Sequence, residues 1–463
     1  MSSHKGILPA VLLSCVVLLS LPAMTQTSTE PETGFWLSDG YGLLVEVSRE
    51  GLQTFELTSI SCVPGWTAKR DSKLKNVFVG NATFRLYDSS SRDVKRLHLD
   101  GTASDILLRR TSGRPAKCTV KPDNSPQGRY AIFWQTFAEQ YAFFNLRHID
   151  WQSVDRQFRP KVGPATKPEE LFEILRQMIE PLQDAHTGIE AEDIKKDFDG
   201  WRNDPNHLEK AEWNKAQEVI ETRYVRGGLR SFCNGRVQFG KLDHSIGYLR
   251  LTAFYGYVDS GNYELALHAL QAALDEVFRD ANQLNGLVID VRLNQGGDDP
   301  LGIEIASRLT SKKYLAYSKV TRNNLEGALH FTDPQESWVT PSSLPGFRGN
   351  VVLLTGPDTV SAGETFTMAV LGRERHVTRI GSNTQGVFSD VLNRRLPNGW
   401  RFHLPNEVYL TAEGKAFDAT GVPPDIRVNF FSVEDLHEGR DAAIEAAQKL
   451  LVGRLAAGRV AYR

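Results

Sequence analysis

The sequence predicts an α/β protein whose main domain follows a small all-β domain and a helical module. Strands and helices alternate from Ser245 to about Val428, a pattern that is typical of an α/β domain. Near the N-terminus, short apolar and β-branched runs separated by glycines indicate a small β-sandwich or barrel. Aromatic residues then recur at helical spacing from Trp134 to Phe144. The predicted boundaries are 34–115 for the β domain, 126–235 for the helical module, 240–430 for the α/β domain and 431–463 for a C-terminal helix.

Composition limits the class of protein. The chain has 463 residues, which predicts two to four domains. Its 41% hydrophobic and 24% charged residues are those of a soluble globular protein, and a net charge of -2 argues against nucleic-acid binding. The N-terminus has Lys5, an apolar run from Ile7 to Leu21, and then small or polar residues. We interpret residues 1–25 as a signal peptide, because about 15 apolar residues are too few to span a bilayer. The protein is therefore expected in the periplasm or outside the cell.

Cysteine usage agrees with an exported protein. After removal of the signal peptide the chain keeps Cys62, Cys118 and Cys233. The first two flank the same N-terminal region and could form a disulfide in an oxidising compartment. The sequence has no paired CxxC motifs and no HExxH helix, so neither a metal nor another cofactor is expected.

The stretch from Val351 to Phe366 carries the most chemical information. It begins as a short apolar run typical of a buried strand, and Gly356 and Pro357 then break the strand. Helical spacing starts at Ala362, so Ser361 lies where a loop meets a helix N-terminus. A serine there can simply cap the helix. It can also be a nucleophile, if a base and N–H donors for an oxyanion are nearby.

Candidate N–H donors come from two loops. Gly296 and Gly297 follow a predicted strand, and glycine allows a backbone to turn its N–H groups toward a developing anion. The N–H of Ala362, in the first turn of the helix, is a second donor. A phosphate-binding loop is the competing interpretation of the glycine pair, but neither GxxxxGK[ST] nor GxGxxG occurs.

For the base, His186 has the most suitable setting among the eleven histidines. It lies in a short polar loop with small neighbours and with Asp184 close by. The alternative is a histidine that stabilises the dipole at a helix C-terminus. His376 and His403 are reserve candidates, although both resemble strand or surface residues.

Four motifs in order resemble the tail-specific, or C-terminal processing, serine peptidase family, which includes the tricorn protease core and the interphotoreceptor retinoid-binding protein repeats. The resemblance covers the chain from about Arg129 through the α/β domain, but not residues 34–115. The four motifs lie at Asp184–Gly188, Val288–Gly297, Val360–Glu364 and Gly421–Asp425.

The resemblance implies a ClpP/crotonase-like spiral of ββα units with Ser361 as nucleophile and Gly296 or Gly297 plus Ala362 as the oxyanion hole. One branch of the family uses a lysine base, but Val387 occupies that position here and cannot accept a proton.

The tricorn-like branch uses a histidine, matched by His186, although the serine that precedes it in that branch is Ala185 here. Its late glutamate maps onto Asp418, which could orient the histidine. Glu364 is the alternative acid, unless it only adds a favourable charge to the helix N-terminus.

The sequence therefore predicts an exported serine peptidase that acts on proteins or peptides through an acyl-enzyme, with no nucleic-acid partner, no stable membrane span and a possible homo-oligomeric state. A catalytically silent protein that binds a small apolar ligand or a peptide on the same fold is the main alternative, because Ala185 and Asp418 depart from the family pattern. A crotonase-like acyl transferase or hydrolase is a further one, but no nucleotide-binding signature is visible. Substrate choice is assigned, as a hypothesis, to the β domain or to the geometry of an oligomer.

Overall fold

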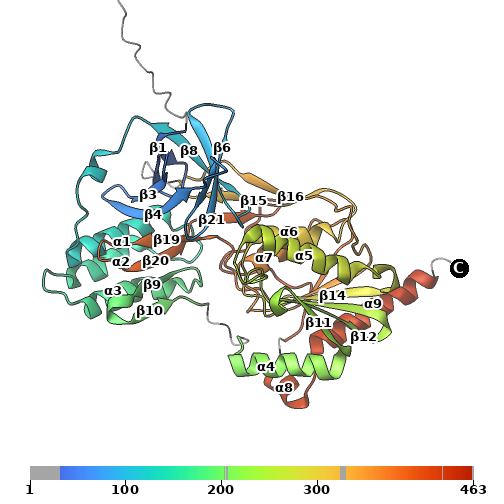
Figure 1. Ribbon diagram of the computed structural model, residues 1–463. Helices are drawn as coiled ribbons and strands as arrows, with labels where there is room; N and C mark the ends of the chain where they lie inside the picture. The colour runs from blue at the N-terminus through green and yellow to red at the C-terminus, as the bar shows by residue number, and fades with distance from the viewer. Residues whose placement is uncertain (1–31, 203, 205–206, 324–329, 430, 461–463) are drawn as a thin grey trace, which may run out of the picture.

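The computed structural model describes residues 32–202, 204, 207–323, 330–429 and 431–460 (Figure 1). The expected signal peptide lies outside the described residues. Within them, no helix is both long enough and apolar enough to cross a membrane.

The N-terminal domain is a closed barrel of eight antiparallel strands in sequence order (Figure 1). Alternate side chains, among them Trp36, Val45 and Leu97, point into a shared core, because successive residues of a strand face opposite sides. Cys62 and Cys118 form the disulfide that the sequence allowed. The strands are β1 Gly34–Ser38, β2 Leu43–Val47, β3 Gly51–Leu57, β4 Cys62–Arg70, β5 Val77–Val79, β6 Thr83–Asp88, β7 Val94–Leu99 and β8 Asp105–Thr111.

The helical module packs against a sheet that combines distant parts of the chain. Its helices are α1 Pro126–Gln140, α2 Trp151–Phe158 and α3 Pro168–Ile179. The sheet has the order β10-β9-β20-β19, with β9 Gly188–Ala191, β10 Lys196–Asp199, β19 Val391–Arg395 and β20 Arg401–Pro405. The aromatic side chains of α1 pack against this sheet, since the ring centroids of Phe133 and Phe137 lie 4.9 and 6.1 Å from that of Phe402 on β20.

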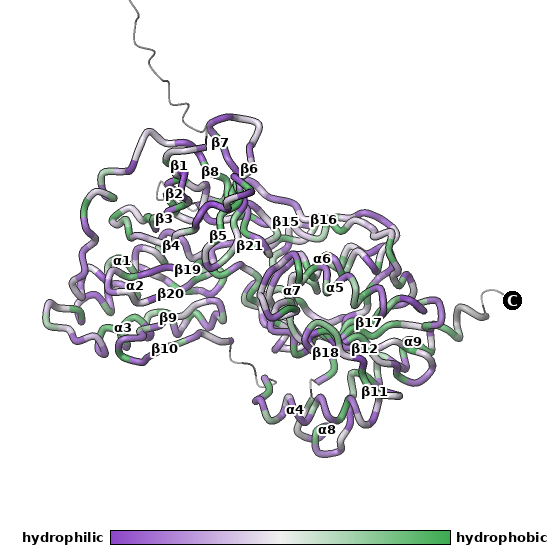
Figure 2. Tube along the Cα trace, viewed as in Figure 1, coloured by the Kyte–Doolittle hydropathy of each residue, from purple (hydrophilic) through white to green (hydrophobic). Residues whose placement is uncertain are grey.

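The α/β domain is built on a seven-stranded sheet of order β11-β12-β13-β14-β17-β18-β22, parallel from β13 to β22. Leu287 and Ile289 of β14 pack with helices α5, α6 and α7, whereas Val288 packs with α4, α8 and α9. Burial on both faces explains the unbroken apolar runs of the central strands (Figure 2). The elements are α4 Lys210–Val219, β11 Arg226–Phe232, β12 Val237–Leu242, β13 Ile246–Leu251, α5 Tyr263–Phe278, β14 Gly286–Asp290, α6 Asp299–Ser307, β17 Val351–Thr355, α7 Ala362–Ala369, β18 Thr378–Gly381, β22 Ile426–Arg427, α8 Val433–Glu438 and α9 Ala442–Val460.

A third, three-stranded sheet joins the α/β domain to the barrel. It has the order β16-β15-β21, with β15 Tyr314–Thr321, β16 Gln335–Val339 and β21 Glu407–Leu410. The side-chain amide of Gln335 donates to the Asp105 carbonyl at 2.8 Å and accepts from its N–H at 3.0 Å. The barrel is therefore attached to the domain that carries Ser361.

Two of the expected boundaries are wrong. Strand β11 at 226–232 pairs with β12 in the seven-stranded sheet, so the α/β sheet begins before the helical module was expected to end at 235. Strands β19 and β20 were assigned to the α/β domain but hydrogen-bond with β9 of the helical module. The expected C-terminal helix is divided into α8 and α9. Pairing between segments far apart in sequence decided the two boundaries, and local patterns do not report it, whereas the helix is divided at Gly439, whose left-handed backbone ends α8.

Candidate active site

Ser361 lies at a strained turn between β17 and α7. Its φ of 54° and ψ of -119° are rarely adopted by residues other than glycine. No N–H of the first helical turn donates to its hydroxyl with hydrogen-bond geometry. Instead its own N–H donates to the Val387 carbonyl at 3.1 Å. Ser361 and Glu364 are arranged as a capping box, with the Glu364 N–H near the serine side chain, but the half-buried hydroxyl accepts no cap hydrogen bond of full geometry.

Glu364 holds this turn in place. Its fully buried carboxyl group accepts hydrogen bonds from the Gly386 N–H at 2.7 Å, the Val387 N–H at 2.8 Å and the Thr384 hydroxyl, and it lies 3.3 Å from the Ser361 N. Burial raises the pKa of Glu364 to about 7, against the opposing effect of these hydrogen bonds. Its contacts therefore join the serine turn to residues 384–387.

The two glycines have different roles. A Cβ on Gly296 would lie 2.7 Å from the Ser361 Cβ, so glycine is required for this close approach. The Gly296 N–H donates to the Asn294 side chain at 3.0 Å and is already used. The backbone of Phe254 pairs with the Gly296 carbonyl and the Asp298 N–H, at 2.7 and 2.9 Å, so the Gly297 N–H points away from that pairing.

This leaves the N–H groups of Gly297 and Ala362 as the pair that can stabilise an anion beside Ser361. Ala362 is the first residue of α7, where an N–H has no partner within the helix and the helix dipole favours negative charge.

His186 is buried in a tight turn ahead of β9. Its N–H donates to the Asp184 carboxylate at 3.0 Å, and the Thr187 N–H donates to the Asp184 carbonyl at 2.9 Å. Burial lowers the pKa of His186 below its ordinary value; the nearby His403 acts in the same direction and the Asp184 charge against it. The imidazole is therefore neutral at pH 7, which is the form that accepts a proton. Its Nδ1 has no hydrogen-bond partner among the described residues.

Asp184 is held by two residues of the helical module. The Tyr141 hydroxyl donates to it at 2.9 Å, and the Arg147 guanidinium forms an ion pair with it at 3.0 Å. Arg147 also donates to the carbonyls of Leu182 and Gln183. No sequence pattern indicates this pairing, because Arg147 lies far from the loop in sequence and stands in no recognisable motif.

Asp418 is buried, and no side chain in the described part of the chain hydrogen-bonds its carboxyl group. Burial raises its pKa well above the ordinary value, and the charges of Asp184 and Glu364 raise it further, while the Phe388 N–H and Arg147 oppose this. Burial and the neighbouring charges therefore favour the protonated form of the isolated Asp418 side chain.

Residues 387–390 connect these groups. The Val387 carbonyl accepts the Ser361 N–H. The Phe388 N–H lowers the pKa of Asp418, and a hydrogen bond with the Ser389 backbone raises the pKa of His186. Among the described residues, no hydrogen bond joins the side chains of Ser361, His186 and Asp418 to one another. The structure thus brings all three against one short segment, which Val387 begins in place of a lysine.

The reserve histidines differ in position. His376 is exposed and bonds Asp425 at 3.1 Å on the surface. His403 lies on β20 beside His186, and burial lowers its pKa. Among the described residues, no group of three or more His, Cys, Asp or Glu side chains is arranged to hold a metal ion.

Comparisons with known proteins bear on the same regions. The sequence model of peptidase family S41 matches residues 245–428, and that of the tricorn protease C1 domain matches residues 122–180. A solved Parabacteroides merdae protein, described only as a candidate peptidase, is 25% identical, with a TM-score of 0.61, and the alignment covers 71% of this chain and 97% of that one. Mature CPAF in complex with lactacystin has the same fold at 11% identity, with a TM-score of 0.52 over 71% of this chain and 97% of its own. A search of curated proteins finds no match. Neither family model reaches the barrel.

Proposed function

Because the chain belongs to peptidase family S41 through its α/β domain and is a serine peptidase, we propose that Ser361 is its nucleophile and His186 its general base. In this proposal the enzyme cleaves proteins or peptides in the manner of C-terminal processing, through an acyl-enzyme that water then hydrolyses.

The conformation of Ser361 is the observation that carries the proposal. A non-glycine residue at φ 54° and ψ -119° costs on the order of 1–3 kcal/mol, and such strain is kept where the surroundings enforce it. Here Glu364 and the Val387 carbonyl enforce it, and Gly296 makes room for the side chain. The result is a hydroxyl free of the helix, beside two available N–H groups.

His186 supports the proposal through its protonation state and its neighbours. A general base must be neutral at the working pH, and burial keeps this imidazole neutral. Both Ser361 and His186 contact residues 387–389, and two residues span at most about 7 Å. A small movement on substrate binding can therefore complete the hydrogen bond between them, since such bonds are often long before substrate arrives.

Asp418 is proposed as the acid that orients His186. The Nδ1 of His186 and the carboxyl of Asp418 are both buried without a side-chain partner in the described part of the chain, and the Asp184 charge acts on both. Pairing the two would satisfy both groups. An ionised Asp418 that accepts Nδ1–H would leave Nε2 free to take the Ser361 proton and would stabilise the imidazolium. The alternative acid, Glu364, has its oxygens occupied by residues 384–387.

The reaction follows from these assignments. His186 takes the Ser361 proton as the hydroxyl attacks the scissile carbonyl, and the N–H groups of Gly297 and Ala362 stabilise the oxyanion. The imidazolium protonates the leaving amine. Water activated by His186 then releases the acyl group from Ser361.

Export is part of the same proposal. The apolar run after Lys5 has the form of a signal peptide, and the Cys62–Cys118 disulfide is suited to an oxidising compartment.

Labelling with a fluorophosphonate tests the nucleophile and the base. The wild-type chain should be labelled at Ser361, Ser361→Ala should not be labelled, and His186→Ala should react at least about 100-fold more slowly. His376→Ala, which alters an exposed histidine, is the matched control and should react as wild type does. A folded wild-type protein that resists the probe would refute the peptidase mechanism and favour a silent binding protein. Unchanged labelling of His186→Ala would place the base elsewhere.

A further inference from the structure

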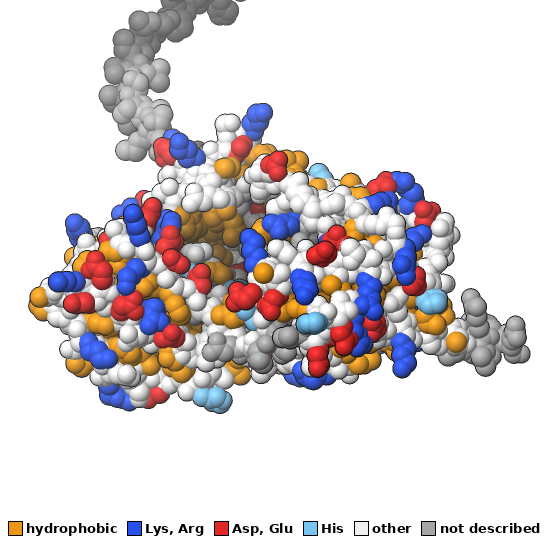
Figure 3. All heavy atoms as spheres, turned by 90° about the horizontal axis from the view of Figure 1, so that it is seen from below, with side chains coloured by type: hydrophobic (Ala, Val, Ile, Leu, Met, Phe, Trp, Pro, Cys, Tyr) orange, Lys and Arg blue, Asp and Glu red, His pale blue; other side chains and the backbone are white. Residues whose placement is uncertain are grey.

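A cavity of about 400 Å³ opens between the barrel and the strands that lead to the active site. Its barrel wall is mostly apolar, and its other wall includes residues 390–395 and Glu407 of β21. Seen from below, the surface is hollowed between the helical module and the α/β domain, with hydrophobic side chains in the hollow (Figure 3). The apolar lining consists mainly of Leu43, Trp66, Phe84, Leu97, Leu99 and Ile106.

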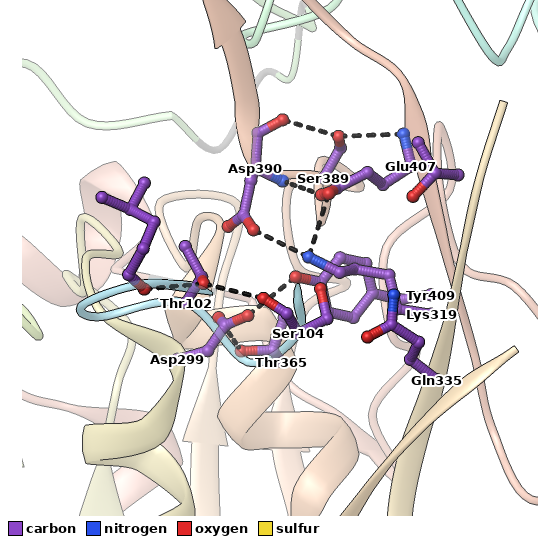
Figure 4. A network of polar contacts seen from close by, with 12 residues as sticks. Thr102, Ser104, Asp299, Lys319, Gln335, Thr365, Ser389, Asp390, Glu407 and Tyr409 are labelled. Atoms are coloured by element: carbon purple, nitrogen blue, oxygen red, sulfur yellow. Dashed lines mark hydrogen bonds and ion pairs between the residues drawn. The ribbon is translucent and has the colours of Figure 1, made fainter. Parts of the chain in front are cut away.

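Three of the charged side chains along the cavity neutralise one another within the protein. Lys319 lies 2.9 Å from both Asp390 and Glu407, and the Tyr41 hydroxyl donates to Glu407 at 2.6 Å. Figure 4 shows this network, in which Asp390 and Glu407 both point toward the Lys319 ammonium. Asp390 and Glu407 raise the pKa of Lys319 well above its ordinary value, although burial opposes this. An occupant therefore meets apolar side chains and no unpaired buried charge in this network, which favours an uncharged, apolar molecule.

Two polar groups of the lining lack partners. Asn406 is 1% exposed, yet neither its amide oxygen nor its amide nitrogen has a hydrogen-bond partner among the described residues. The Ser104 hydroxyl is also buried without a hydrogen-bond partner among the described residues. Buried polar groups are nearly always paired. A side-chain amide offers one acceptor and one donor side by side, which complements the N–H and C=O of a peptide backbone.

The cavity adjoins the catalytic segment. Its lining includes Asp390, and Val387, three residues earlier, accepts the Ser361 N–H. Three residues of extended chain span at most about 11 Å. A substrate whose scissile bond lies at Ser361 therefore reaches the cavity within a few residues.

We propose that the cavity holds an extended apolar segment of the protein substrate while the same chain is cleaved at Ser361. This inference rests on the proposed function and names its substrate class, a polypeptide with an apolar stretch a few residues from the cleaved bond. The apolar side chains enter the barrel, and the backbone of the segment pairs with Asn406.

Peptide binding to the full-length Ser361→Ala protein tests the cavity without any need for cleavage. The probes are a dye-labelled peptide with a run of leucine, valine and phenylalanine, and a control peptide in which serine and asparagine replace that run. Fluorescence anisotropy should detect the first and at least about tenfold weaker binding of the second. A dye-labelled fatty acid is measured in parallel.

Two neighbouring residues of β8 supply a matched pair of variants. Ile106 lines the cavity, whereas Leu107, also half-buried, faces the opposite side of the same strand. In the Ser361→Ala background, Ile106→Arg should weaken the apolar peptide at least about tenfold, and Leu107→Arg should leave its affinity unchanged. Equal effects of the two, or binding of the fatty acid alone, would overturn the proposal.

Asn406→Leu provides a second test that does not depend on a destabilising change. Replacing an unpartnered buried amide with an apolar side chain should leave the melting temperature unchanged or raise it. It should nevertheless weaken the apolar peptide about tenfold, because the backbone of the peptide loses its partner. Unaltered affinity would refute the role of Asn406. None of these results depends on fluorophosphonate labelling of Ser361, so failure of the cavity and failure of the catalytic proposal are distinguishable.

Discussion

The guanidinium of Arg147 lies 3.0 Å from the carboxylate of Asp184, and both side chains are almost completely buried. This ion pair holds Asp184 in place, and the Asp184 carboxylate in turn accepts the backbone N–H of His186, two residues further along the chain. Loss of Arg147 leaves a buried carboxylate without its countercharge, so Arg147→Ala should lower the free energy of unfolding by about 3–5 kcal/mol. Chemical denaturation measures this, and fluorophosphonate labelling should slow as His186 loses its position.

A double variant controls for that result. Arg147→Met combined with Asp184→Asn removes the charge together with its partner, so stability should recover relative to Arg147→Ala. If the double variant is no more stable than the single one, the cost is lost packing of the arginine side chain and not an uncompensated charge.

The pH dependence of labelling should report His186. Burial lowers the pKa of this histidine below the ordinary value of 6.5, so labelling should rise with pH and reach half its maximum below pH 6.5. The charge of His403 contributes to the lowering, so His403→Gln should move the midpoint upward. A midpoint above 6.5 in the wild-type protein would contradict this environment for the base.

The same shift has a consequence for stability. Between the lowered folded pKa and the unfolded value of 6.5, the unfolded chain binds more protons, so stability should fall as the pH decreases through this window. His186→Gln should remove this part of the pH dependence, as measured by denaturation at a series of pH values.

Gly296→Ala should lower the reactivity of Ser361, because the added methyl group would clash with the serine side chain. A Cβ at this position would lie 2.7 Å from the Ser361 Cβ, and the backbone φ of 80° adds about 1–2 kcal/mol of strain. We expect labelling to fall at least about tenfold. Gly414→Ala is the matched control, because Gly414 has a φ of 77° but nothing within 4 Å of its added Cβ. It should lose similar stability and keep its labelling; a comparable loss of labelling in both would mean that strain alone is responsible.

Removal of the Glu364 carboxyl should release the serine turn. Glu364→Ala deletes three hydrogen bonds to residues 384–387, at about 1 kcal/mol each, and should abolish labelling. Glu374→Ala also deletes hydrogen bonds, to Thr310 and Ser311, but these lie away from Ser361 and labelling should persist. Labelling that survives in Glu364→Ala would show that the turn needs no such anchor.

The pKa of Glu364, raised to about 7, makes stability depend on pH in the opposite direction to the lowered pKa of His186. Because the folded pKa lies above the unfolded value of 4.5, the folded state binds more protons between these limits. The contribution of Glu364 to stability should therefore decrease as the pH rises from 4.5 to 7. Stability measured over this range should depend less on pH in Glu364→Gln.

Local sequence patterns were sufficient to predict part of this structure. The apolar run from Val351 and the helical spacing after Ala362 predict the strand, turn and helix around Ser361, because strand and helix periods are properties of neighbouring residues. The same holds for the β domain, which the structure confirms as a barrel. The family resemblance, confirmed by the S41 and tricorn C1 matches, came from short motifs of this kind.

By itself, then, the sequence determined the class of enzyme, the presence of a small N-terminal all-β domain and the setting of Ser361. Only the tertiary structure decided that Arg147 holds Asp184, that β20 joins β9, and that Asn406 faces the barrel cavity. These contacts join residues from different parts of the chain. They depend on burial and on the close approach of distant backbones, and no periodicity within a single segment records either.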